Sequence, residues 1–175
     1  NLSGDTVVAL IKKVDQHALY DALVMKNHFG VTPLYLLAKN RPDEALMAFI
    51  EKADQKAINE LLVMQVNRGQ TLFHIAASRK SPKALMALIQ KVDQKSLSVA
   101  LVMQDNIGET PLHIAVKNLS LSDDTVMALI EKVDQDTLSK ALVMPNTYLR
   151  TPLHLAVQNL SGDTVVALIK KVDQH

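Results

Sequence analysis

The stretch Thr110-Pro-Leu-His-Ile-Ala-Val116 decides the fold, because closely related stretches recur along the chain. The related stretches are Thr32-Pro-Leu-Tyr-Leu-Leu-Ala38, Thr71-Leu-Phe-His-Ile-Ala-Ala77 and Thr151-Pro-Leu-His-Leu-Ala-Val157. Their threonines are separated by 39, 39 and 41 residues. Self-similarity at a fixed period of roughly 20 to 50 residues is the sequence signature of a repeat architecture. The sequence therefore predicts a tandem array.

Two further markers fall in the same register. Asp-Gln pairs begin at Asp15, Asp54, Asp93, Asp134 and Asp173, and Leu-Val-Met triplets begin at Leu23, Leu62, Leu101 and Leu142. Together the markers predict one single repeat array over residues 1–175. Its predicted parts are a partial unit 1–31, units 32–70, 71–109 and 110–150, and a partial unit 151–175.

Each unit is predicted to contain three helices and a turn. The first helix opens with Thr-Pro, since Thr caps free amides and Pro suits the first helical position. The second helix is expected to start after a polar cap such as Asp124 or Asp163, and the short third helix to run near Ser96 to Val102 in one unit. Gly108 in the following turn is expected to adopt a positive φ. The fold class that follows is an all-α helical repeat solenoid.

The composition excludes several classes of protein. The net charge is +1, so bulk electrostatics gives no attraction to nucleic acid or to an anionic membrane surface. The chain has no cysteine, which excludes disulfides, thiol catalysis and cysteine-based zinc sites and favours a reducing compartment. No apolar run approaches the roughly 20 residues of a membrane-spanning helix. We therefore expect a cytoplasmic protein with no nucleic acid or membrane partner.

The segment Asn106-Ile-Gly-Glu-Thr-Pro-Leu-His-Ile-Ala115 resembles the loop and first helix of the ankyrin repeat. Departures are the longer units, the missing Pro in Thr71-Leu-Phe-His74, and Tyr35 and Leu149 in place of the usual His and Gly. The resemblance implies a protein-binding module that meets another protein through its turn tips and the concave face of its first helices. The long units are also similar to those of effectors that intracellular bacteria inject into hosts, which implies a host cytosol as one location.

The positions at which the units differ are the candidate binding residues, because scaffold positions are nearly the same in every unit. Aromatic residues and Arg are the usual anchors of protein interfaces. The alternative is that apolar turn residues fold back on their neighbours. The candidates are the tips Phe29, Arg68, Ile107 and Tyr148, the adjacent residues His28, Asn67, Asn106 and Leu149, and the first-helix positions Lys39, Ser78, Lys117 and Gln158.

Residues with catalytic or metal-binding potential have simpler structural interpretations. His74, His113 and His154 recur at one repeat position, and neighbouring helices lie about 10 Å apart, too far for these rings to share a zinc ion. The resemblance implies instead that this His ties the loop to the start of the helix, a role that Tyr35 is also expected to fill. The Asp123-Asp124 pair is interpreted as a helix cap rather than as an acid–base pair. No catalytic residue, metal site or cofactor is predicted, and an enzyme is not expected.

Residues Asn1 to His17 are identical to residues Asn159 to His175. This identity predicts a chain cut from a longer, or intended-to-be-longer, array. Both partial units leave apolar faces at the ends, with Leu10, Ile11 and Val14 at one end and Leu168, Ile169 and Val172 at the other. Such ends normally need polar caps. The alternative to partner binding is therefore a structural array that stacks head to tail into oligomers or filaments.

Overall fold

A computed structural model of the chain describes residues 3–40 and 42–172, and in these residues all regular structure is helical. The described residues form thirteen α-helices and one short 3₁₀ turn, Asn67–Gly69. The predicted all-α repeat solenoid is confirmed. Asn1, the last residues of the repeated segment and the predicted cap Asp173 lie outside the described residues.

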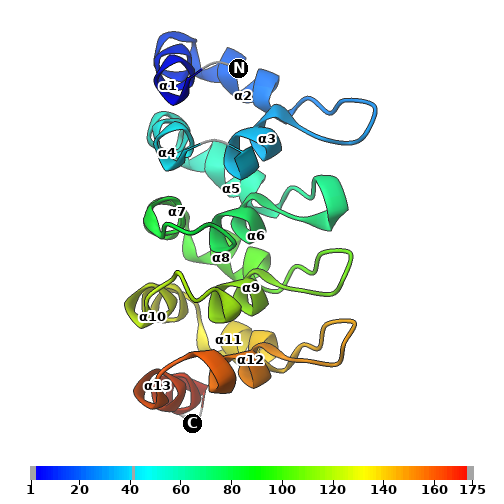
Figure 1. Cartoon of the computed structure of the whole chain (residues 1–175), viewed down its shortest axis with the longest axis vertical. Coiled ribbons are helices and arrows are strands. Elements are labelled where there is room, and N and C mark those ends of the chain that lie inside the picture. The colour runs from blue at the N-terminus through cyan, green and yellow to red at the C-terminus, as the bar shows by residue number, and fades with distance from the viewer. Residues whose placement is uncertain (1–2, 41, 173–175) are drawn as a thin grey trace.

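Helices of the same kind in successive units form columns (Figure 1). The first helices are α3 (Pro33–Asn40), α6 (Leu72–Ala77), α9 (Pro111–Lys117) and α12 (Pro152–Asn159). The second helices are α1 (Gly4–Lys13), α4 (Asp43–Lys52), α7 (Lys83–Lys91), α10 (Asp123–Lys132) and α13 (Gly162–Val172). The third helices are α2 (Gln16–Val24), α5 (Gln55–Val63), α8 (Gln94–Leu101) and α11 (Gln135–Val143).

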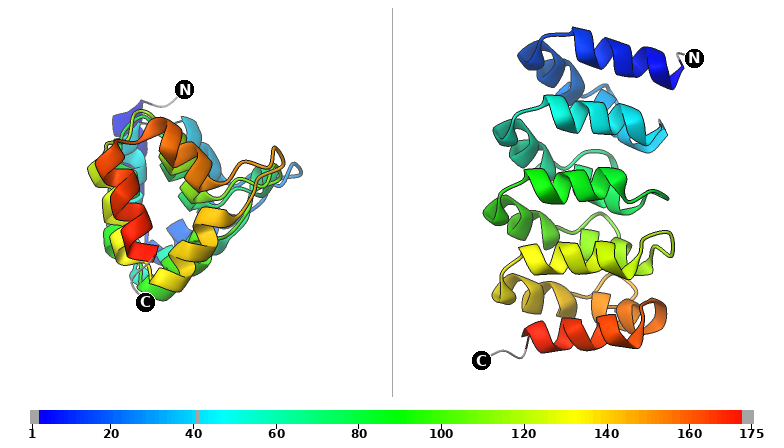
Figure 2. Two further views of the ribbon diagram at one scale, coloured as in Figure 1. Left: turned by 90° about the horizontal axis from the view of Figure 1, so that it is seen from below. Right: turned by 90° about the vertical axis from the view of Figure 1, so that its left-hand side faces the viewer.

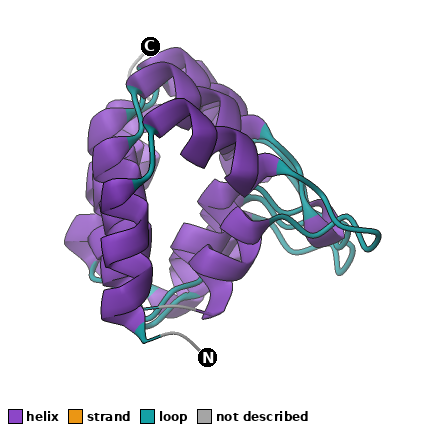
Figure 3. Cartoon of the chain, turned by 90° about the horizontal axis from the view of Figure 1, so that it is seen from above, coloured by secondary structure: helices purple, strands orange, loops and turns teal. Residues whose placement is uncertain are grey.

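Packing runs mainly between neighbouring units. The second helices contact one another in sequence from α1 to α13, and the first helices do so from α3 to α12. The second-helix column faces the viewer in the right-hand view of Figure 2. Seen along the axis, the three columns form three sides of the stack, and the loops project beyond them (Figure 3).

The hydrophobic core is continuous from unit to unit. Its largest fully buried side chains include Phe49, Phe73, Leu97 and Leu112, which come from first, second and third helices. Burying a side chain of this size contributes about 1.5–3 kcal/mol relative to its exposure. Because the buried residues of all units form one continuous cluster, the stack is stabilised as a whole rather than unit by unit.

The third helices begin as the Asp-Gln markers indicate. The carboxylates of Asp54, Asp93 and Asp134 each accept a hydrogen bond from an amide three residues later, at 2.7, 2.6 and 2.7 Å. Asp15 accepts from two amides of its helix. The predicted capping role is confirmed, and the helix in the second full unit starts earlier than expected, at Gln94, because Asp93 caps it.

The two second helices with a predicted cap, α10 and α13, each start two residues earlier than predicted. Ser122 caps α10 by accepting from the amide of Thr125 at 3.3 Å, and Ser161 does the same for Thr164. Asp124 and Asp163, the expected caps, lie inside the first turn, where a negative charge suits the helix dipole.

The carboxylate of Asp123 reaches the next unit instead of capping its own helix. It accepts hydrogen bonds from the amide of Ser161 at 3.1 Å and from the hydroxyl of Thr164 at 2.6 Å. The capping interpretation of the Asp123-Asp124 pair was therefore wrong in its detail: one carboxylate fastens α13 to α10.

A lysine near the end of α4, α7, α10 and α13 joins each of these helices to the preceding second helix. The ammonium of Lys52 donates to the carbonyls of Ile11 and Lys12 at 2.9 and 2.8 Å, and that of Lys91 donates to Glu51 at 2.9 Å. Lys132 and Lys171 make the same kind of contact with the helix before them. These bonds satisfy carbonyls that a helix end leaves without intrahelical partners.

Candidate functional site

The candidate site lies on four loops that project from one side of the stack, each between a third helix and the next first helix (Figure 1). We call them the loop row and define them as residues 25–31, 64–70, 103–109 and 144–150. They contain all the predicted tip residues.

A single side chain folds each of three loops. Asp105 accepts hydrogen bonds from the amides of Ile107 at 3.0 Å and Glu109 at 2.9 Å. Asn27 and Asn146 make equivalent pairs of bonds in the first and fourth loops. Sequence analysis missed this role, although an Asn or Asp recurs at the position. The second loop has Val66 there instead and forms the 3₁₀ turn.

Main-chain bonds hold the second, third and fourth loops side by side. The amide of Asn106 donates to the carbonyl of Arg68 at 2.9 Å, and the amide of Thr147 donates to that of Ile107 at 3.0 Å. Gln104 adds a bond from its side chain to the carbonyl of Pro145 at 3.0 Å. The tips of these three loops therefore occupy fixed positions relative to one another.

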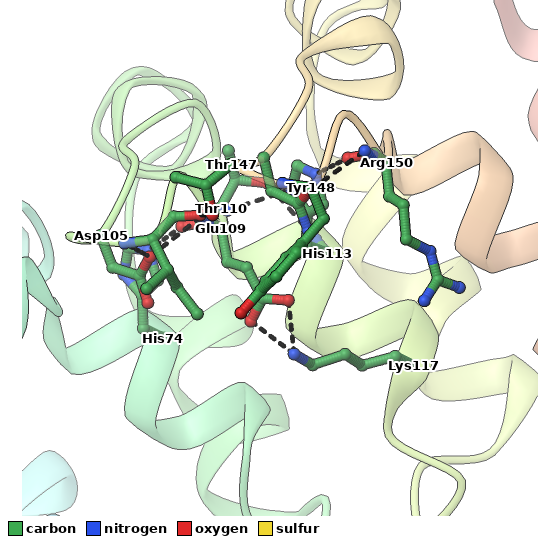
Figure 4. A network of polar contacts seen from close by, with 11 residues as sticks. His74, Asp105, Glu109, Thr110, His113, Lys117, Thr147, Tyr148 and Arg150 are labelled. Atoms are coloured by element: carbon green, nitrogen blue, oxygen red, sulfur yellow. Dashed lines mark hydrogen bonds and ion pairs between the residues drawn. The ribbon is translucent and has the colours of Figure 1, made fainter.

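The two buried histidines tie the third and fourth loops to the stack (Figure 4). The amide of Thr110 donates to Nδ1 of His113 at 3.1 Å, which leaves the proton on Nε2. Nε2 then donates to the carbonyl of Arg150 in the next loop at 3.0 Å. His74 repeats the arrangement with the carbonyl of Glu109 at 3.0 Å. The structural interpretation of these two histidines is confirmed.

Burial also affects the titration of these rings. It lowers the pKa of both His74 and His113 below the ordinary value of 6.5, because removal from water disfavours the charged imidazolium. Neutral rings are what the hydrogen-bond pattern requires, since Nδ1 must accept.

His154 and Tyr35 depart from the pattern. His154 keeps the bonds to Thr151, including one of 2.7 Å between Nδ1 and the hydroxyl, but its ring is exposed in the last unit. The expected role of Tyr35 was wrong, because its hydroxyl accepts a hydrogen bond from Lys39 at 3.1 Å within its own helix.

The tips are open to solvent. Phe29 and Tyr148, in the first and last loops, are 85% and 72% exposed. Ile107, Arg68 and Leu149 are exposed as well, and none of them folds back to become buried. Among the adjacent candidates, His28 and Asn106 are exposed and Asn67 is half-buried.

Two of the first-helix candidates bond to the loop before them. Lys117 forms an ion pair with the largely buried carboxylate of Glu109 (Figure 4). Gln158 accepts a hydrogen bond from the guanidinium of Arg150. Both pairs join residues eight positions apart and brace the loop against its first helix.

The other two first-helix candidates bond within their own helices. Lys39 donates to Tyr35, and its ammonium lies 5.3 Å from the centre of that ring. The hydroxyl of Ser78 donates to the carbonyl of Ile75 at 2.8 Å. All four first-helix candidates are exposed but already have intramolecular partners, and their role in binding stays a prediction.

A cleft of about 390 Å³ at the ends of α3 and α6 was not anticipated. Arg79 crosses it, forming an ion pair with Asp43 and donating to the carbonyl of Ala38. These bonds close the end of α3, so we assign the pair a structural role.

Within residues 3–40 and 42–172, no group of three or more acidic or histidine side chains is arranged to hold a metal ion. Nor does any helix in this part of the chain have the length and apolar character needed to cross a membrane.

Comparison with known proteins gives one finding. A family model described as "Ankyrin repeats (3 copies)" matches residues 34–137 and 94–175, so that its two matches together span all but the first 33 residues. No curated protein matches the chain.

Proposed function

This chain belongs to the ankyrin-repeat family, whose repeats are generally protein–protein interaction modules, and we propose that it binds another protein through the loop row. The family is typically non-catalytic, in keeping with the interaction role. Proteins built as stacked repeats commonly bind along their extended surfaces.

The observation that carries the proposal is the exposure of large side chains on four neighbouring loops, three of which are held in register by main-chain bonds. Phe29 and Tyr148 project into solvent at the two ends of the row, with Arg68 and Ile107 between them. Aromatic residues and Arg supply most of the binding energy at protein interfaces. Loops fixed by main-chain bonds lose little conformational entropy when they bind, which favours affinity.

The charges on and beneath the loop row suggest which chemical groups the partner's surface offers. Glu109 and Lys117 neutralise each other beneath the tips. The row itself presents apolar and aromatic groups together with three exposed cations, Lys26, Arg68 and Arg150. We infer a partner that offers an apolar surface with a nearby carboxylate, since that charge would complement Arg68.

The test begins with photo-crosslinking. A photoreactive phenylalanine analogue is placed at position 29 or 148, and in a control chain at Leu119, which is exposed in the turn between α9 and α10 and outside the row. Proteins captured at both row positions but not at the control position are the candidate partners. Capture only at the control position would contradict the proposal.

The second step measures the affinity of the captured partner for variants. The double substitution Phe29→Ala and Tyr148→Ala is expected to weaken binding at least tenfold, whereas Leu119→Ala should leave it unchanged. Circular dichroism of both variants checks that the fold is intact. Equal affinities for the double variant and the original chain would place the binding site elsewhere.

The cytoplasmic location, including a host cytosol, stays a prediction. Head-to-tail self-association is supported by a separate set of observations on the two end units.

A further inference from the structure

The residues of segment 3–14 recur as the identical segment 161–172, and the two segments form helices α1 and α13. Identical helices at opposite ends of the array pack with opposite faces. In α1, Ile11 is 3% exposed and Leu10 is 57% exposed. In α13 the equivalent residues are reversed, because Leu168 is completely buried and Ile169 is 43% exposed.

The face that α13 leaves exposed therefore has a known partner in this same molecule. In α1 that face packs on α4, with Ile11 buried and Val7 and Val8 partly buried against the core. Lys52 of α4 also donates to the carbonyls of Ile11 and Lys12. An α4 surface would meet the same side chains and the same carbonyls on α13.

The first helices beside them are complementary in the same way. On α12, Leu153, His154 and Val157 are partly or largely exposed, although the equivalent Leu112, His113 and Val116 of α9 are buried by the helix after them. These three residues line a shallow groove of about 360 Å³.

At the other end, α3 exposes Leu36, although the equivalent Ile75 and Ile114 are buried by the helix before them. Inside the array, each first helix packs its outward face on the next first helix, as α6 does on α9 and α9 does on α12. The exposed faces of α12 and α3 are the two sides of the same kind of contact.

We propose that α12 and α13 of one copy dock on α3 and α4 of a second copy and displace the second copy's α1. The α13 helix would take the place of α1 with the same residues, so these contacts are exchanged one for one. The contact between α12 and α3 is new, because within residues 3–40 and 42–172 the only first helix that α3 packs against is α6, on its other side. Its apolar burial drives the association.

The positions of His154 and of the neighbouring loops are compatible with the contact between α12 of one copy and α3 of the next. His74 and His113 each donate to the carbonyl that precedes the next first helix, and the same step places His154 against Val31 of the second copy. Leu149 is bulkier than the Gly of other loops. However, a Cβ built on Gly30 meets nothing within 4 Å, so a loop junction without close packing already occurs in the array.

Simple stacking of α13 on an undisplaced α1 fits less well. It would bury the exposed faces of those two helices but would leave α12 and α3 without partners. Exchange covers the faces of α12, α13 and α3, while the displaced α1 gives up to α13 the contacts that it makes with α4. Each copy then offers a free α12–α13 end and a free α3–α4 end. Such a heterologous contact propagates unless the superhelix closes.

Engineered disulfides test the exchange directly, since the chain has no cysteine. A Cβ built on Gly4 lies 3.9 Å from Cβ of Pro42, within the range of about 3.5–4.5 Å that a disulfide needs. Gly162 is the equivalent of Gly4 in α13, and a Cβ there meets nothing within 4 Å. A cysteine at position 162 therefore reaches one at position 42 only if α13 of one copy occupies the α1 place of another.

In the first arm, the variant Gly162→Cys with Pro42→Cys is oxidised at increasing concentrations. Exchange predicts covalent dimers and larger species that disappear on reduction, with the 42–162 linkage found by peptide mass spectrometry. Gly162→Cys alone reports random collisions, because it can give only 162–162 links. Absence of the 42–162 linkage at every concentration would overturn the proposal.

In the second arm, Gly4→Cys with Pro42→Cys locks α1 in place by an intramolecular disulfide, and formation of that bond also shows that the variant folds. Light scattering of the unmodified chain should give a mass that at least doubles from 19.3 kDa as concentration rises. The locked variant should stay at that mass until it is reduced. A constant mass for the unmodified chain, or an equal rise for the locked one, would refute exchange.

Discussion

One residue of the fourth loop, Leu149, has a strained backbone. Leu149 adopts a left-handed backbone, with φ of 58°, at the position where the other loops have glycine. A side chain in that region costs about 1–2 kcal/mol, because Cβ approaches the following carbonyl. Its side chain is exposed and recovers little by burial.

Leu149→Gly should therefore stabilise the chain by about 0.5–1 kcal/mol, since glycine removes the strain but also makes the unfolded chain more flexible. Urea unfolding monitored by circular dichroism measures the change. The contrasting variant is Gly108→Ala, which should destabilise, because its Cβ would lie 3.0 Å from Cα of Asn146. A loss of stability in Leu149→Gly would show that the loop does not hold this strain.

The two buried histidines predict a pH dependence of stability. Their pKa is lowered in the folded state from 6.5, so below that pH the unfolded chain binds more protons. The stability they contribute is complete above about pH 6.5 and falls as pH decreases toward their folded pKa. Urea unfolding between pH 8 and pH 5 should show this fall, and it should be smaller in His74→Gln with His113→Gln. An equal fall in the free energy of unfolding in both chains would contradict the lowered pKa of the two histidines.

Between neighbouring helices, the lysine contacts stabilise the second-helix column. Lys91 donates to carbonyls at the end of α4, and partial burial lowers its pKa below 10.5. Lys91→Met keeps most of the apolar stem but removes these bonds, and we expect a loss of about 1 kcal/mol. Lys140→Met, on the exposed side of α11, is the matched control and should change stability little. Equal effects in urea unfolding would show that the contact with α4 contributes nothing.

The sequence predicted the number, order and kind of helices, because repeat register and Thr, Pro and Asp caps are local signals. It placed the tips correctly on exposed loops for the same reason. It could not show that Lys117 pairs with Glu109, since the way the loop folds back on its first helix sets that partner. Nor could it show that Asp123 fastens the next unit, since that contact is set by how units stack. The error at Tyr35 arose because its hydroxyl bonds to Lys39 within the same helix instead of reaching the next loop.

For the whole molecule, burial is uneven along the axis. In α9 every residue from Pro111 to Val116 is buried, whereas α1 buries only Ile11 and α13 buries only Thr164 and Leu168. Repeat stability is approximately the sum of each unit and its neighbouring interfaces, and end units have one interface each.

Amide hydrogen exchange should follow this gradient. We expect the slowest exchange in α6 to α9 and the fastest among the helices in α1 and α13, because local opening needs less energy where fewer contacts break. Mass spectrometry of peptic fragments resolves the units. Uniform protection from α1 to α13 would indicate that the array unfolds in one step.

Because packing in this array runs mainly from each unit to its neighbours, a pulling force applied to the two ends passes through every interface in series. The weakest interface yields first, and the others keep their structure while it does so. Each released unit of 39 residues supplies about 130 Å of extended chain. The molecule would thus lengthen under tension in a series of nearly equal steps, one for each unit that unfolds.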